Sequence, residues 1–304
     1  EILDYFYPAY QLGMTATPQT DVNRNTYIYF EQPLYEYTLQ QGIEDGFLAP
    51  YRVYRVSTTW DTFGWRPTPD EIDRYGRTIP DAEYQTGDFE KAVSLKARTE
   101  AIARHITDYL KRTNRFAKTI VFCVDQSHAQ EMVVALNNLN TDLVREYPNY
   151  VCRITSDEEE WGKARLYEFQ DPEERTPVIA VTSKMLSTGV DVPTCENVVL
   201  VRVIRSMVEF KQIVGRGTRV AEDYNKLSFT ILDYTNSTRL FADPRFMGFP
   251  EAVINAEIDG DGEVISEEEE ETETDASEEE TYPEVDGDEP FAGEVNDDDA
   301  PTGF

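Results

Sequence analysis

The chain has 304 residues, a formal net charge of −31, three cysteines and two histidines. No apolar run approaches the roughly 20 residues of a membrane span, and three widely spaced cysteines favour a reducing, cytoplasmic compartment over a disulfide framework or a zinc site. Two histidines leave little material for a histidine-based hydrolase. So acidic a chain does not hold nucleic acid through a generally basic surface, and any DNA contact is expected to be local.

The first 87 residues show little regular periodicity. Thr15, Ala16 and Thr17, followed by Pro18, indicate a strand that ends in a loop, and residues 27–30 predict a short strand. Residues 51–56 alternate in the manner of a half-buried strand. The surrounding sequence is rich in Pro, Gly, Asp and Arg, and it predicts a linker or insertion over residues 31–87.

From residue 88 onward, predicted strands alternate with predicted helices. The strands cover residues 119–124, 150–155, 178–182, 197–203 and 227–233, and the helices cover residues 89–112, a segment capped by Ser127, residues 158–170 and residues 207–214. This alternation is typical of an α/β fold with a parallel sheet covered by helices on both faces. Such sheets bind ligands beyond the carboxyl ends of their strands, which is where we expect the functional clusters.

The last 54 residues differ sharply in composition. Residues 251–304 hold 23 Asp and Glu and no Lys or Arg, which leaves a net charge near −8 for residues 1–250. Such a segment buries too little apolar surface to offset the entropy of ordering, so residues 251–304 are predicted to be disordered. A solvated spacer and a DNA-mimicking autoinhibitor are both compatible with this composition.

The strongest functional signal follows residue 211. Arg216 and Arg219 are three apart on a predicted helix and are expected on one face. Planar guanidinium groups suit a phosphoryl group, and Gln212, one turn earlier, can reach the same phosphate or an attacking water. Gly215 and Gly217 are expected to keep this face open to a partner surface. The alternative is a solvated helix with two unpaired arginines.

A second cluster follows the predicted strand 178–182. Gly189 permits close backbone approach to a nucleotide, and Asp191 can accept a hydrogen bond from a ribose hydroxyl. Thr182 and Ser183 are short hydroxyl residues suited to phosphate contact. Taken alone, Gly189 and Asp191 are equally compatible with an ordinary turn.

In this order, the clusters at 15–18, 182–191 and 212–219 resemble motifs III, V and VI of superfamily 2 helicases, with residues 119–128 where motif IV belongs. In that superfamily two RecA-like domains close over ATP, and the second supplies an arginine finger. The resemblance implies a finger at Arg219, a companion on the phosphate at Arg216, a γ-phosphate sensor at Gln212, nucleotide contacts at Gly189 and Asp191, coupling of ATP state to DNA grip through Thr15, Ala16 and Thr17, and DNA backbone contacts at Thr182 and Ser183.

A closer resemblance covers residues 1 to about 250. Segments 35–37, 45–51, 119–123, 206–212, 233–235 and 240–244 are similar to the restriction subunit of type I restriction-modification enzymes. That family implies ATP- and Mg²⁺-dependent translocation of double-stranded DNA, a separate nuclease domain, and methylation and specificity subunits as partners. Phosphate-binding loop, acidic metal motif and nuclease motif are missing here and are expected upstream of Glu1.

The resemblance therefore predicts the end of a first RecA-like domain at residues 1–30, a linker at 31–87, the second RecA-like domain at 88–250 and the acidic segment at 251–304. ATP and Mg²⁺ would be held mainly by the missing upstream domain, so the chain alone is expected to be inactive, and it contributes no metal ligand. The alternatives are another superfamily 2 repair translocase or RNA helicase, and a degenerate motor half that acts as a binding module.

Overall fold

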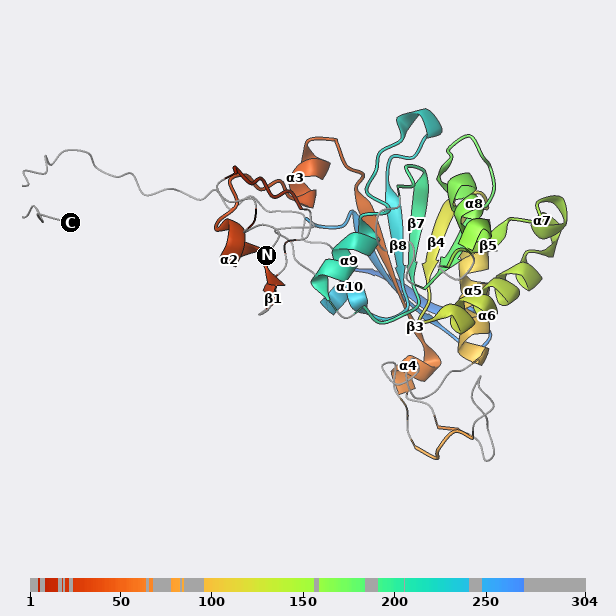
Figure 1. Cartoon of the computed structure of the whole chain (residues 1–304). Coiled ribbons are helices and arrows are strands. Elements are labelled where there is room, and N and C mark those ends of the chain that lie inside the picture. The colour runs from red at the N-terminus through yellow and green to blue at the C-terminus, as the bar shows by residue number, and fades with distance from the viewer. Residues whose placement is uncertain are drawn as a thin grey trace, which may run out of the picture. The chain divides into compact units, whose positions relative to one another are not determined.

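The computed structural model describes residues 5, 9–15, 18, 20–21, 24–63, 66–67, 78–82, 84, 96–155, 159–183, 191–204, 206–240 and 248–270 (Figure 1). An eight-stranded sheet has the order β10-β9-β3-β8-β7-β4-β6-β5. Its strands are β3 (Tyr51–Thr58), β4 (Lys118–Phe122), β5 (Val151–Arg153), β6 (Ile179–Thr182), β7 (Cys195–Leu200), β8 (Phe229–Asp233), β9 (Ala252–Ile258) and β10 (Val264–Glu270). All neighbours pair in parallel except β9 and β10, which confirms the α/β class.

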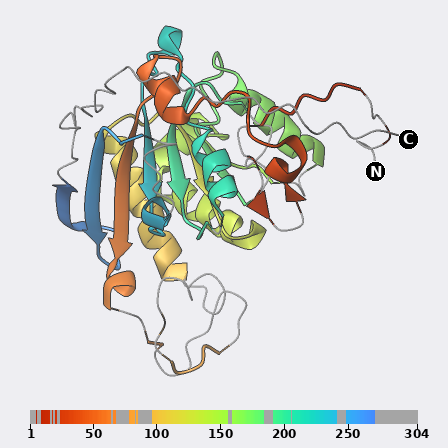
Figure 2. The same cartoon turned by 90° about the vertical axis from the view of Figure 1, so that its left-hand side faces the viewer.

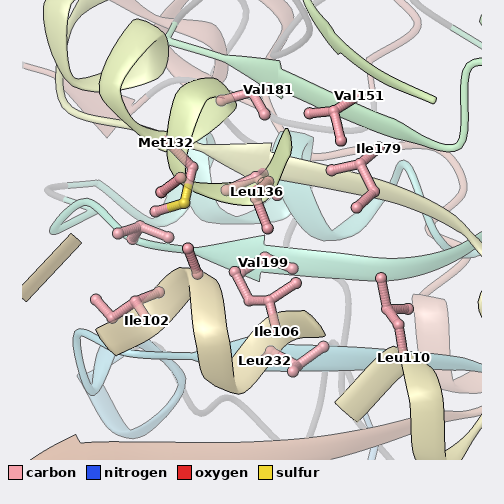
Figure 3. Close-up of a cluster of buried hydrophobic side chains, with 14 of the residues drawn as sticks. Ile102, Ile106, Leu110, Met132, Leu136, Val151, Ile179, Val181, Val199 and Leu232 are labelled. Atoms are coloured by element: carbon pink, nitrogen blue, oxygen red, sulfur yellow. The ribbon is translucent and has the colours of Figure 1, made fainter. Parts of the chain in front are cut away.

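Helices cover both faces of this sheet. The larger ones are α5 (Lys96–Arg112), α6 (Gln126–Leu139), α8 (Glu159–Gln170) and α9 (Met207–Val214), and the shorter ones are α3 (Leu39–Glu44), α4 (Thr59–Phe63), α7 (Thr141–Glu146), α10 (Ser237–Leu240) and the 3-10 turn η3 (Glu222–Tyr224). Ile106 of α5 and Met132 of α6 pack on Val199 and Leu232 of the sheet (Figure 3). Phe169 of α8 and Phe210 of α9 belong to a second core cluster. Each such side chain contributes about 1.5–3 kcal/mol by burial.

The central strands are buried along their whole length, as continuous apolar runs predict for a parallel sheet. Helix α9 spans the predicted residues 207–214, and Ser206 caps it by accepting a hydrogen bond from the Glu209 amide at 3.1 Å. Helix α6 starts one residue before the expected cap at Ser127. Its cap is Asp125, whose carboxylate accepts from the His128 amide at 2.8 Å.

The predicted strand at 51–56 is present as β3, but it is no part of a separate linker. It lies inside the sheet between β8 and β9, and the 90° view in Figure 2 shows it there. Tyr51, Val53, Tyr54 and Val56 are all buried because both faces of this strand are covered. A covered strand does not need the strict alternation of a half-buried one.

The sheet also continues past residue 250, where we expected the acidic segment to begin. Val253, Ala256 and Ile258 of β9 are buried, so this segment contributes apolar surface to the core although its overall composition is acidic. Glu267–Glu270 lie exposed on the edge strand β10, where charges discourage pairing with a further strand. The prediction of disorder from residue 251 is therefore wrong for residues 251–270, and residues 271–304 lie outside the described part.

Near the N-terminus the described residues include a two-stranded pairing of β1 (Thr20–Asp21) with β2 (Arg24–Asn25) and the helix α2 (Thr26–Phe30). The predicted strand at 27–30 is wrong, because these residues are helical. None of these side chains is buried. β-propensity reflects the packing of side chains on a half-buried sheet, and these exposed residues lack that packing.

No helix among the described residues is long and apolar enough to cross a membrane. His105 is buried in the core, where its Nδ1 lies 2.6 Å from the Tyr234 hydroxyl. Burial lowers the pKa of His105 to about 4, so the ring is neutral near pH 7.

Candidate functional site

The arginine turn, residues 215–219, lies at the amino ends of the strands. The Ala49 amide, just before β3, donates to the Thr218 carbonyl at 2.8 Å, and Leu48 forms a β-bridge with Arg219. We expected this cluster beyond the carboxyl ends. It lies at the opposite edge because α9 follows the carboxyl end of β7 and returns across the sheet before the turn begins.

The arginines also lie beyond the helix rather than on one of its faces. Helix α9 ends at Val214, Gly215 is its C-cap, and the amides of Arg216 and Gly217 donate to the carbonyls of Ile213 and Val214 at 3.1 and 2.9 Å. The spacing of Arg216 and Arg219 therefore follows the turn and not the period of a helix. Gln212 is half-buried on the last turn of α9, at the same end.

Gly217 serves internal packing. A Cβ atom there would lie 2.2 Å from Cδ2 of Phe229, the first residue of β8. Because Phe229 is buried, that contact could not relax into solvent. The missing side chain thus brings the arginine turn against the sheet, instead of opening it to a partner as we expected.

Arg219 meets Asp191, and the resemblance had assigned both residues to the nucleotide. Nη2 of Arg219 lies 3.1 Å from Oδ2 of Asp191, and the two side chains are 60% and 56% exposed. An exposed ion pair contributes only about 0–1 kcal/mol, so the guanidinium can exchange this carboxylate for a more highly charged anion. Gly189 lies outside the described residues.

Arg216 is partly buried next to this pair. Burial lowers its pKa, and the Asp191 carboxylate acts in the opposite direction. An arginine nevertheless stays charged near neutral pH. Two cations therefore lie on one turn, with one exposed carboxylate close to both.

Lys226 holds the arginine turn from inside. Its side chain is 2% exposed, and its ammonium donates to the carbonyls of Gly217 and Arg219. Burial lowers the pKa of Lys226 to about 8. We did not single out this residue from the sequence, where it is one lysine before an apolar strand, and only the long-range contacts reveal its place.

Thr182 and Ser183 lie at the other edge, at the carboxyl end of β6. Both are buried, with exposed fractions of 0% and 7%, and Oγ1 of Thr182 has no hydrogen-bond partner among the described residues. The structure thus separates the predicted DNA contacts from the arginine turn by the length of the strands. Thr15 is exposed, whereas Ala16 and Thr17 lie outside the described residues, so the coupling role stays a prediction.

The arginine turn presents two guanidinium groups, whose planar shape suits an anion such as a phosphoryl group. Within the described ranges no three His, Cys, Asp or Glu side chains converge as a metal site.

Comparisons with known proteins identify relatives of this chain. Residues 99–221 match the helicase conserved C-terminal domain. The chain is 52% identical over 255 residues to the type I restriction enzyme EcoAI endonuclease subunit of Escherichia coli, covering 84% of this chain and 31% of that protein. It is 32% identical over 247 residues to the EcoKI endonuclease subunit of E. coli K12, covering 76% of this chain and 20% of that protein.

Among solved structures, one is described as a fragment of an HsdR subunit of a type I restriction enzyme from Vibrio vulnificus YJ016. It is 57% identical with a TM-score of 0.75, and the match covers 87% of this chain and 47% of that one. The chain thus spans less than a third of the length of the curated relatives that it matches.

Proposed function

Because the chain belongs to the endonuclease subunits of type I restriction enzymes and carries their helicase C-terminal domain, we propose that it is the second half of an ATP-driven motor for double-stranded DNA. One observation carries this proposal: Arg219 lies exposed at the edge of the sheet, bound only weakly to Asp191, on a turn that a buried lysine holds in place. A cation that is exposed to solvent but fixed in position can bind an anion that another domain supplies.

ATP would lie between this edge and a domain that carries the phosphate-binding loop and the magnesium ligands. The nucleotide supplies the phosphoryl group and its negative charge. Arg219 and Arg216 bind and orient that charge from this side, and Gln212, at the end of α9, approaches the same phosphate. Asp191 is then released from Arg219 and is available to a ribose hydroxyl, with Gly189 as the second nucleotide contact.

The proposed DNA contacts, Thr182 and Ser183, lie at the opposite edge of the sheet, at the carboxyl end of β6, where both side chains are buried and a DNA phosphate would meet the ends of the strands. Separate edges allow one domain to hold nucleotide and DNA at once. Methylation and specificity subunits are the proposed partners of the full-length protein, and its nuclease activity is proposed to reside in another domain.

The test is the nucleic-acid dependence of ATP hydrolysis by the full-length protein that contains this chain. We expect duplex DNA with Mg²⁺ to stimulate hydrolysis, and we expect movement along the duplex, measured by displacement of a third strand. Stimulation by RNA instead would favour an RNA helicase. No stimulation by any nucleic acid would favour a degenerate, non-catalytic module.

A further inference from the structure

Three side chains converge on the carboxylate of Glu270, the last residue of β10. Nη1 of Arg55 donates to both carboxylate oxygens at 3.1 and 3.0 Å, Nη2 of Arg239 donates at 3.2 Å, and Nδ2 of Asn255 donates at 2.9 Å. The donors come from β3, α10 and β9, so the fold gathers them from distant parts of the chain. We call Arg55, Arg239 and Asn255 the anion pocket.

The pocket is built in advance of its occupant. Arg55 is only 16% exposed, and its Nε donates to the Thr238 hydroxyl at 3.1 Å. Thr238 in turn donates to the buried Asp233 carboxylate at 2.8 Å. A guanidinium fixed in this way loses little freedom when it binds an oxyanion, and its planar fork fits a phosphate as well as a carboxylate.

The pocket opens on a cleft of about 320 Å³ whose lining includes Arg55, Arg239 and Asn255 together with Thr235 and Asn236. Glu270 fills the pocket only from the rim, because its side chain is 42% exposed. Hydrogen bonding from Asn255 and the charge of Arg55 hold the pKa of Glu270 below its usual value, so the occupant is an anion.

The pocket also shares an edge of the sheet with Thr182. Five residues form one continuous row of register pairs across five neighbouring strands. The row runs from Thr182 to Phe122, Leu200, Asp233 and Arg55. Four strand steps of about 4.8 Å place the backbones of Thr182 and Arg55 roughly 19 Å apart. That distance is within the reach of one duplex lying along the edge.

We propose that the anion pocket binds a backbone phosphate of duplex DNA and that Glu270 occupies it as an internal competitor until DNA arrives. This inference rests on the proposed function, and it adds a second phosphate contact to the edge that carries Thr182. The pocket binds a single carboxylate, and a phosphodiester has the same charge as the carboxylate that it would displace. The alternative is an ion pair that only fastens the edge strand β10.

The test compares Glu270→Gln with Glu269→Gln in the full-length protein. Both variants remove one negative charge from neighbouring exposed positions of β10, but only Glu270 contacts the arginines. In fluorescence anisotropy with a short duplex at moderate salt, we expect Glu270→Gln to raise the affinity about three- to tenfold. Glu269→Gln should change it less than twofold. Equal affinities for the two variants would overturn the proposal.

A second comparison separates the pocket from a merely structural effect. Arg55→Gln should lower the salt dependence of binding by the loss of about one phosphate contact, and it should abolish the gain of Glu270→Gln when the two are combined. Arg52→Gln is the control, because Arg52 lies on the same strand as Arg55 and forms an exposed pair with Glu251 instead. A gain that persists in the Arg55→Gln background would assign Glu270 to the stability of β10 and contradict the pocket. In that case, ATP hydrolysis stimulated by duplex DNA would still support the proposed function. If the parent protein bound no duplex DNA at all, the proposed function itself would be contradicted.

Discussion

Replacing Arg219 by lysine should lower the DNA-stimulated ATP turnover of the full-length protein by about 10³-fold or more. Arginine fingers contribute about 10³ to 10⁵ in rate in related phosphoryl-transfer systems, and lysine cannot reproduce the planar fork. ATP binding should stay close to the parental value, because another domain holds most of the nucleotide. Steady-state hydrolysis and equilibrium nucleotide binding measure the two effects separately.

Arg52→Lys is the matched control for this experiment, since Arg52 also forms an exposed ion pair, with Glu251 at 3.2 Å. It should leave turnover unchanged. Arg216→Ala should reduce turnover in the manner of Arg219→Lys and weaken nucleotide binding in addition. Turnover by Arg219→Lys within tenfold of the parent would remove Arg219 from the reaction.

Lys226→Met is the second change with a large expected effect. Lys226 is buried, and its ammonium fixes the carbonyls of Gly217 and Arg219. Methionine leaves these carbonyls without the lysine donor, and the turn that carries Arg219 loses one of its anchors. A displacement of about 1 Å can cost about 10²-fold in rate, so turnover should fall by about that factor.

Lys118→Met provides the control for Lys226→Met. Lys118 is also buried, its ammonium donates to the Pro177 carbonyl at 2.9 Å, and burial lowers its pKa to about 8 as well. Loss of a buried lysine in general should affect both variants alike, whereas loss of turnover through the arginine turn belongs to Lys226 alone. The double variant Arg219→Ala with Lys226→Met should be no slower than Arg219→Ala, because both changes act through one group. Additive losses would show that Lys226 acts elsewhere.

The alternation of strands and helices after residue 88 was predictable from the sequence, because buried strands and amphipathic helices carry local apolar patterns. The family match and the mostly parallel sheet confirm a RecA-like fold. The places of β3 and β9 were not predictable in this way. The pairing of β3 with β8 and with β9 joins residues about 180 to 200 positions apart, and no local pattern records such a contact.

The candidate site shows the same division. The residue types alone pointed to Arg216, Arg219 and Asp191, because guanidinium and carboxylate groups can bind charged or polar partners in any structural context. The geometry depended on where α9 ends and on which edge of the sheet it reaches, and a helix was wrongly extended through Gly215. Lys226 and the anion pocket were missed because their meaning lies entirely in tertiary contacts.

ATP turnover by the isolated 304-residue chain, with Mg²⁺ and saturating duplex DNA and beside its Arg219→Ala variant, shows whether this chain is one half of a motor. We expect no hydrolysis above background for either protein, because in the proposed function this chain supplies only the arginine side of the nucleotide site and the described residues hold no metal site. Background rates for both proteins would agree with a chain that forms only one half of an ATP-driven motor. A rate above background that depends on Arg219 would contradict the account, since it would require a complete phosphate and metal site within this chain.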